Sequence, residues 1–330
     1  MSGDGSGNYS MDDSLESPPP PDQDSEPLRP PPASPVEAYP PPSFADHMYT
    51  VFVGPGGLRV GWRFLLYLCI GFATFSILGG LANQLHGIGS LREMFVDKAV
   101  FVLAVMLPAV AMARIERCRF GAYGLPRHGL LGRNFWIGTL WGLGGITLLL
   151  LILYFAHAFD FGYPVLQGQR IVKFAVFWGA FFMLVALSEE FLFRGYTLFT
   201  LTQGIGFWPS AVVLSIAFGA IHLQNNGEAW IGVVAAGAIG FFFCLTLRRT
   251  GDLWFALGFH AAWDWGETYL YSVPDSGMVS PGHLLHSSFH GPTWLTGGDV
   301  GPEGSVLLFV VMAVLWITFD RLYPEVKYKG

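Results

Sequence analysis

Charged side chains are scarce in this chain, and several signatures of common hydrolases are missing. Asp, Glu, Lys and Arg make up 13% of the 330 residues, whereas 52% are hydrophobic and 16% are aromatic. This composition excludes an ordinary soluble protein and favours one that is embedded in a membrane. The sequence contains no Gly-x-Ser-x-Gly and no His-Glu-x-x-His segment. It therefore lacks the usual marks of a serine hydrolase and of a zinc peptidase.

Cysteine and histidine form no clear metal-binding or disulfide pattern. The three cysteines, Cys69, Cys118 and Cys244, are far apart in the sequence. We therefore expect neither a disulfide framework nor a zinc knuckle. We expect these cysteines to be packed as apolar side chains instead. A Gly- and Pro-rich loop at about 273–303 has no Lys or Arg but contains three histidines, His283, His286 and His290. Nothing else in this loop completes the shell of a zinc ion, so we predict no metal site there.

Residues 1–47 have almost no aliphatic side chains. They contain twelve prolines, nine acidic residues and one arginine. A segment that buries little apolar surface does not offset its ordering entropy, so we predict a disordered, acidic, Pro-rich tail. A basic segment followed by an apolar core is also missing, so no signal peptide is expected. The net charge of −6 reflects this tail, which carries −8 against +2 for the rest of the chain.

Residues 48–330 contain a succession of long apolar runs, and we interpret them as one polytopic membrane domain. About 20 apolar residues are needed to span a bilayer as a helix. Eight runs meet or approach this length: 62–83, 95–115, 134–158, 171–193, 208–223, 229–247, 253–272 and 304–322. The predicted fold class is an all-α integral membrane protein, a bundle of about eight transmembrane helices with an intramembrane polar chamber. Seven helices is the alternative.

Basic residues are distributed unevenly among the segments between these runs. If the N-terminus is cytoplasmic, the cytoplasmic segments hold thirteen Lys and Arg residues and the external segments hold four. This bias agrees with the positive-inside rule for an even number of spans. We therefore expect a multi-pass protein of the bacterial plasma-membrane type, with both termini in the cytoplasm.

Small residues recur every four positions in two of the apolar runs. They are Gly138 and Gly142 in one run, and Gly232, Ala236 and Gly240 in another. This spacing predicts close helix packing.

A charged motif ends the apolar run 171–193. Glu189, Glu190 and Arg194 lie within six residues, at a depth where each charge costs about 2.5–3.5 kcal/mol on insertion scales. On a helix, Glu190 and Arg194 share a face and can pair, whereas Glu189 points about 100° away. One glutamate is thus predicted to be held by the arginine while the other remains free for chemistry. A purely structural ion pair is the alternative interpretation.

Two further apolar runs carry ionisable groups. Phe218 and His222 are four residues apart and are followed by the polar segment 224–226; His260 and Asp264 are also four apart. Ionisable residues inside a membrane usually face the interior of the helix bundle and mark functional sites. Alone, His222 could be a hydrogen-bonded core histidine, and His260 and Asp264 a local pair. Three such motifs on separate helices predict a common polar site.

This set of residues can activate a water molecule. Glu189 with His222 can hold and deprotonate the water. His260, together with Asp264 if it is protonated, can donate hydrogen bonds to the oxyanion of a tetrahedral intermediate. No Ser or Cys with a paired base stands out as a nucleophile. The predicted catalytic residues are Glu189, His222, His260 and Asp264, supported by Glu190 and Arg194.

The order Glu-Glu-x-x-x-Arg, Phe-x-x-x-His and His-x-x-x-Asp resembles the CPBP intramembrane proteases, the family that includes the type II CAAX prenyl endopeptidase. The resemblance covers about residues 170–270. It implies a catalytic chamber within the bilayer and a glutamate-dependent endopeptidase, with Glu189 as the water-activating group, His222 as its partner and CAAX-type lipidated peptides as substrates. Asp264 departs from the pattern, because the prenyl endopeptidase has an oxyanion-hole asparagine there. An aspartate must be protonated to donate; otherwise it orients His260.

Other functions fit the same residues. A non-proteolytic scaffold, such as a bacteriocin self-immunity protein of this family, would need the fold but not Glu189. A transporter or proton relay would also use buried Glu and His, although no internal repeat is evident. Glu189, His222 and His260 are residue types that bind zinc, so a metal-dependent protease stays open; otherwise no cofactor is expected. The expected partners are membrane lipids and a membrane-anchored or lipidated peptide, and no nucleic acid.

Overall fold

The computed structural model describes residues 43–55, 57–85, 90–224 and 230–328. The chain divides into two units, Met1–His47 and Met48–Gly330. Most of the predicted tail lies outside the described residues, as do Asn225 and Asn226. The helices are α1 (Phe44–Phe52), α2 (Val60–Ala82), α3 (Ser90–Ile115), α4 (Arg133–Phe155), α5 (Gln169–Glu190), α6 (Thr197–Ile205), α7 (Phe207–His222), α8 (Trp230–Thr250), α9 (Trp254–Trp265), α10 (Thr293–Thr296) and α11 (Leu307–Leu322). The strands are β1 (Val53–Gly54), β2 (Gly57–Leu58), β3 (Phe159–Asp160) and β4 (Ser288–Phe289), paired antiparallel as β1 with β2 and β3 with β4.

The described chain is all-α apart from these two-residue strands, which confirms the predicted class. Within the described residues, five helical segments are long and apolar enough to cross a membrane: Val60–Ala82, Leu91–Ile115, Arg133–Phe155, Gln169–Ile205 and Trp230–Thr250. The remaining three predicted runs overlap α7, α9 and α11, which have 16, 12 and 16 residues. These helices are shorter than the usual transmembrane length. The count of about eight therefore stays a prediction.

The helix that carries the Glu-Glu-Arg motif is longer than a bilayer requires. α5 continues through a π-helical segment, Phe191–Tyr196, into α6, so that helical backbone extends over 37 residues from Gln169 to Ile205. Within this segment Gly195 leaves helical geometry, with φ −85° and ψ −113°. π-Helical turns are rare and occur often at functional sites. Here the turn begins directly after Glu190.

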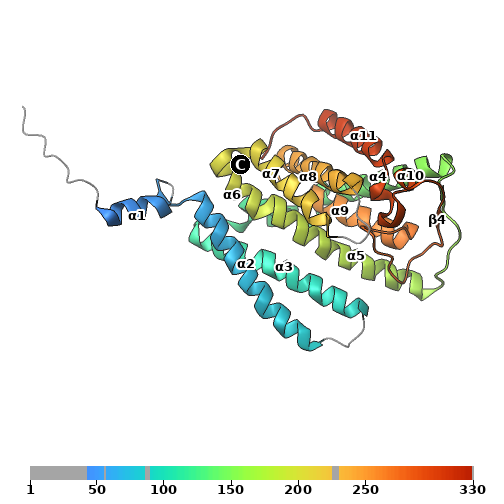
Figure 1. The fold of residues 1–330 in the computed structure, drawn as a ribbon, viewed down its shortest axis with the longest axis horizontal. Helices are drawn as coiled ribbons and strands as arrows, with labels where there is room; N and C mark the ends of the chain where they lie inside the picture. The colour runs from blue at the N-terminus through green and yellow to red at the C-terminus, as the bar shows by residue number, and fades with distance from the viewer. Residues whose placement is uncertain (1–42, 56, 86–89, 225–229, 329–330) are drawn as a thin grey trace, which may run out of the picture. The chain divides into compact units, whose positions relative to one another are not determined.

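The helices around α5 place the three motifs close together. α3 and α9 both contact α5, and α7 packs along α8. Figure 1 shows α2 and α3 lying side by side as a hairpin, with α5 running between α3 and α9. The buried side chains form two main cores, and α8 and α9 contribute to both. Of the three cysteines, which are all free, Cys244 is packed as predicted, whereas Cys69 is exposed on α2.

α4 and α9 approach each other backbone to backbone. A Cβ atom added to Gly138 would lie 2.0 Å from the carbonyl oxygen of Phe255, and one added to Gly142 would lie 2.1 Å from that of Phe259. Only glycine permits such an approach. The small residues predicted to pack helices on 134–158 therefore fix the position of α9, which carries the His-x-x-x-Asp motif.

A partly buried polar network ties the hairpin of α2 and α3 to the π-helical segment. Glu116, just after α3, accepts hydrogen bonds from Arg63 Nε at 2.9 Å and from Tyr196 Oη at 2.6 Å on Oε1. Its Oε2 lies 2.7 Å from Arg63 Nη2 and accepts from Tyr123 Oη at 3.0 Å. Each carboxylate oxygen thus has two donors, an arrangement of strong, charge-assisted bonds. Through Tyr196, the network holds the end of the π-helical segment that follows Glu189 and Glu190.

Gly142→Ala is expected to lower the thermal unfolding temperature, because the added methyl group pushes α4 away from α9 and such overpacking costs about 1–3 kcal/mol or more. The matched control is Gly144→Ala on the same helix. Gly144 is exposed, and a Cβ there meets nothing within 4 Å. Thermal melts of the detergent-solubilised protein should show a lower midpoint for Gly142→Ala alone. Equal midpoints would contradict the backbone packing.

Candidate active site

A cavity of about 620 Å³ lies between the helices that carry the three motifs. Its walls include all four residues predicted to be catalytic: Glu189, His222, His260 and Asp264. Aromatic and aliphatic side chains from α3, α5, α8 and α11 form much of the remaining surface. A mostly apolar cavity of this size with a few converging polar groups is typical of ligand sites.

Glu190 is fully buried and binds two partners through one oxygen. Its Oε1 accepts hydrogen bonds from Arg194 Nη1 at 3.2 Å and from His260 Nδ1 at 2.9 Å. A carboxylate of this kind only accepts, so Nδ1 of His260 carries the hydrogen. Glu190 therefore pairs with Arg194, as the spacing predicts, and in addition orients the histidine of another helix.

Arg194 is also fully buried and is surrounded by aromatic rings. Its guanidinium carbon lies 4.2 Å from the ring centre of Phe218 and 5.9 Å from that of Phe243. Such cation–π contacts stabilise a desolvated arginine. Gly240 on α8 leaves room for it, because a Cβ there would lie 2.1 Å from Nη2. Gly240 thus makes room both for the guanidinium of Arg194 and for the ring of Phe218 on α7.

Glu189 has a different environment from its neighbour. Its side chain is 19% exposed; Oε1 lies 3.8 Å from Lys98 Nζ and Oε2 lies 3.9 Å from His260 Nε2. These separations are ion-pair distances and are longer than hydrogen bonds. Glu189 therefore faces the cavity with both oxygens near basic side chains, whereas Glu190 is enclosed.

α9 places His260 among three carboxylates. Nε2 of His260 lies 3.4 Å from Asp264 Oδ2, and its ring stacks on Phe243 with a centroid distance of 5.9 Å. Because Nδ1 is bound to Glu190, Nε2 is the nitrogen that faces Asp264 and Glu189. His260 can donate from both nitrogens when it is an imidazolium, and the surrounding carboxylates supply the counter-charge.

His222 lies on the cavity wall at the end of α7. Its Nδ1 donates to the carbonyl oxygen of Phe218 at 2.7 Å, and its ring packs on that of Phe218 with centroids 4.7 Å apart. The tautomer that donates from Nδ1 leaves Nε2 as the acceptor. The four-residue spacing of this motif therefore serves to orient the imidazole. Gln224, the described member of segment 224–226, is exposed.

Besides Asp97, four charged residues in or near the cavity were not singled out from the sequence. Lys98, counted there as an external charge, lies close to Glu189, and Asp275 and Glu303 reach the cavity from the loop 273–303. Burial raises the pKa of Asp275 well above its usual value, and the nearby charges of Asp264 and Glu303 add to the effect. The fourth residue, Glu267, follows Asp264 by three positions in an apolar run, a signal that was visible in the sequence.

The carboxylates, rather than the histidines, form the cluster with metal-binding spacing. Within the described residues, one group of three or more His, Cys, Asp or Glu side chains has ligand atoms within 4.8 Å of one another: Asp264, Glu267 and Asp275. The set offered as zinc ligands, Glu189, His222 and His260, is not gathered in this way. In the loop, His283 Nδ1 is hydrogen-bonded to Ser280 O and His290 Nε2 lies 2.9 Å from Asp160 Oδ2.

Glu190→Gln is expected to destabilise the protein by about 3–5 kcal/mol, because it leaves the buried charge of Arg194 without its partner. Asp320→Asn is the matched control. Asp320 pairs with Arg249 at 2.6 Å, but its side chain is 49% exposed, and surface pairs contribute about 0–1 kcal/mol. Denaturant or thermal unfolding in detergent measures both. Similar stabilities for the two variants would show that the buried pair is not needed for folding.

Residues 171–266 match a family described as type II CAAX prenyl endopeptidase Rce1-like. The matched range begins in α5 and ends directly after α9, so it contains all three motifs. No curated protein and no solved structure matches the chain. Together with the five apolar helices, the match supports an integral membrane protein and a membrane endopeptidase. This match over residues 171–266 confirms the resemblance to the CPBP/CAAX proteases that was drawn from the three motifs.

Proposed function

We propose that this protein is an intramembrane endopeptidase that uses a water molecule activated by Glu189 to cleave a membrane-anchored or lipidated peptide. The observation that carries the proposal is the contrast between two adjacent glutamates. Glu190 is buried and bound to two partners, whereas Glu189 faces a cavity that His222, His260 and Asp264 also line. A carboxylate in this position is suited to act as a general base.

In the proposed mechanism, Glu189 takes a proton from a water molecule, and the resulting hydroxide oxygen attacks the carbonyl carbon of the scissile peptide. His222, through Nε2, helps to hold this water. The carbonyl oxygen becomes an oxyanion, which His260 stabilises by donating from Nε2. Glu190 keeps His260 in this orientation through Nδ1. As the carbon–nitrogen bond breaks, Glu189 returns the proton to the leaving amine.

For the membrane arrangement we propose eight spans with both termini in the cytoplasm. The supporting observation is the bias of thirteen Lys and Arg residues against four between the two sides. The shorter helices α7, α9 and α11 would complete the five longer ones. In this topology the loop 273–303 is external, and because Asp275 and Glu303 of that loop line the cavity, the active site lies toward the external half of the membrane.

The apolar walls of the cavity support the proposed class of substrate. The peptide must reach a chamber whose walls are mostly aromatic and aliphatic, which favours a segment that is anchored in, or attached to, the membrane. Processing of a prenylated CAAX-type terminus is the activity that the matched family name suggests. A bacterial-type plasma membrane remains the proposed location.

Glu189→Gln is expected to reduce cleavage by about 10²–10⁴-fold, the usual contribution of a general base, without lowering the melting temperature. The measurement is cleavage of a quenched fluorescent membrane-peptide library in liposomes, with and without a chelator. Retained cleavage in Glu189→Gln would remove Glu189 as the base. Loss of cleavage on chelation would favour the metal-dependent alternative, and a folded parent that cleaves nothing would favour the scaffold.

Asp264→Asn is expected to keep cleavage within a few-fold of the parent, because an amide can donate toward the oxyanion in place of a protonated carboxyl. Asp264→Ala, which removes the donor, should lose about 10²–10³-fold, as the loss of one oxyanion-hole donor does elsewhere. The same liposome assay compares the two. If Asp264→Asn were as inactive as Asp264→Ala, the carboxylate itself would be required.

A further inference from the structure

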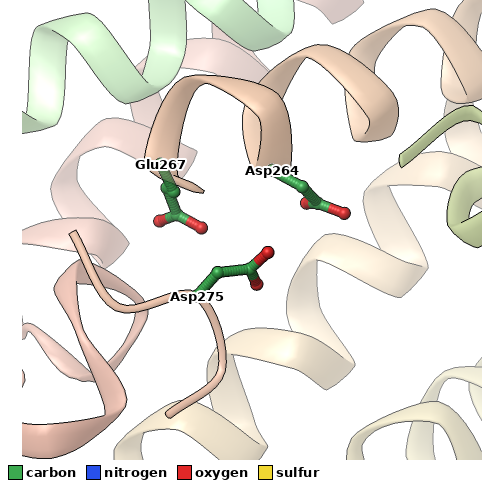
Figure 2. Close-up of side chains that lie close together, drawn as sticks. All are labelled: Asp264, Glu267 and Asp275. Atoms are coloured by element: carbon green, nitrogen blue, oxygen red, sulfur yellow. The ribbon is translucent and has the colours of Figure 1, made fainter. Parts of the chain in front are cut away.

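We propose that Asp264, Glu267 and Asp275 form a binding site for a hard divalent cation, with Ca²⁺ the best fit. Each residue offers one carboxylate oxygen, and these oxygens lie within 4.8 Å of one another. Figure 2 shows Asp264 and Glu267 projecting from the same helical segment, while Asp275 reaches toward them from the loop that follows. All three residues are buried.

Glu267 gives independent support for a ligand at this position. Its exposed fraction is 0%, and neither of its carboxylate oxygens has a hydrogen-bond partner among the described residues. The indole of Trp263 is near enough to interact with it but does not reach hydrogen-bonding geometry. A buried carboxylate without a partner is costly and calls for a physical explanation. Its carboxylate points into the space shared with Asp264 and Asp275 (Figure 2), where a cation would satisfy it.

The other two carboxylates are only partly satisfied by protein groups. Asp275 accepts a hydrogen bond from Thr268 Oγ1 at 3.2 Å, and Asp264 lies 3.4 Å from His260 Nε2. Glu303 adds a fourth negative group to the same cavity wall and accepts from Ser276 at 2.8 Å. A divalent cation would offset this accumulation of negative charge, and Glu303 or water could complete its coordination.

The donor set selects the class of metal. Carboxylate oxygens suit Ca²⁺, Mg²⁺ and Mn²⁺, whereas zinc sites favour imidazole and thiolate. Ca²⁺ accepts six to eight oxygens at about 2.3–2.6 Å in a flexible geometry, whereas Mg²⁺ demands near-ideal octahedral geometry, keeps several waters and usually takes only one or two carboxylates. Three carboxylate oxygens that lie within 4.8 Å of one another therefore suit Ca²⁺ better than Mg²⁺. This site is separate from a zinc site made of Glu189, His222 and His260.

The cation would connect two parts of the proposed active site. It would cross-link the end of α9 to the loop that begins at Val273. If the proposed peptidase function holds, on which this consequence rests, the cation would also neutralise Asp264 in place of the proton, and His260 alone would then donate to the oxyanion. An aspartate could then stand beside a developing oxyanion without repelling it, which accounts for the departure from the asparagine of the prenyl endopeptidase.

The test is direct binding to the purified full-length protein in detergent, with Tb³⁺ as a luminescent probe excited through tryptophan. Trp263 lies on the cavity wall, whereas residues 1–47 contain nine acidic residues but no tryptophan. Because the chain has eleven tryptophans, the variants of the three carboxylates assign the signal to this site. We expect saturable luminescence that Ca²⁺ displaces at least tenfold more effectively than Mg²⁺. Ca²⁺ should also raise the melting temperature.

Glu267→Gln and Asp275→Asn should each weaken Tb³⁺ and Ca²⁺ binding at least tenfold. Asp299→Asn, which changes an exposed carboxylate in the same loop, is the matched control and should bind like the parent. Glu189→Gln should also bind like the parent, so binding is measured independently of peptidase activity. Absence of saturable tryptophan-sensitised luminescence in the parent, or parent-like binding by Glu267→Gln, would overturn the proposal. If Glu267→Gln does not fold, Asp275→Asn and the Ca²⁺–Mg²⁺ competition on the parent decide it.

Discussion

The structure depends on one oxygen atom, Oε1 of Glu190, which binds a guanidinium of its own helix and an imidazole of another. Both Glu190 and Arg194 are fully buried, so water solvates neither charge and each needs a partner within the protein. The aromatic rings around the guanidinium and the glycine that makes room for it become necessary for the same reason. Through His260, the same oxygen fixes the geometry of α9 relative to α5. A pair that stabilises the fold thereby also arranges the cavity.

The cavity gathers several acidic side chains, whose charge the protein must balance wherever they are ionised. Glu189 lies near Lys98 and His260, and Asp264 also faces His260. Beyond Asp264, Glu267 and Asp275 have no basic side chain as a hydrogen-bond partner in the described chain. Asp264 stands between these two groups of acids. Its environment therefore couples the proposed chemistry at Glu189 to the acidic cluster at the end of α9.

The local elements of this fold were predictable because they follow from properties of short segments. Apolar runs located each long helix, and the four-residue spacing of Glu190 and Arg194 predicted their contact. Gly138 and Gly142 indicated a close helix partner. The identity of that partner, α9, was not predictable, since small residues show that a backbone approaches but not which one. Likewise Glu267 was visible as a charge in an apolar run, whereas Asp275 looked like any loop residue.

The sequence by itself determined the all-α class, the three motifs and the different positions of two adjacent glutamates, because helical periodicity fixes which side chains share a face. Only the tertiary structure decided which groups meet across helices. The bond from His260 to Glu190 joins residues 70 positions apart, and Lys98 reaches Glu189 from α3. The convergence of Asp264, Glu267 and Asp275 depends on how the external loop folds back on α9. Such contacts arise from the packing of whole elements, which no local spacing encodes.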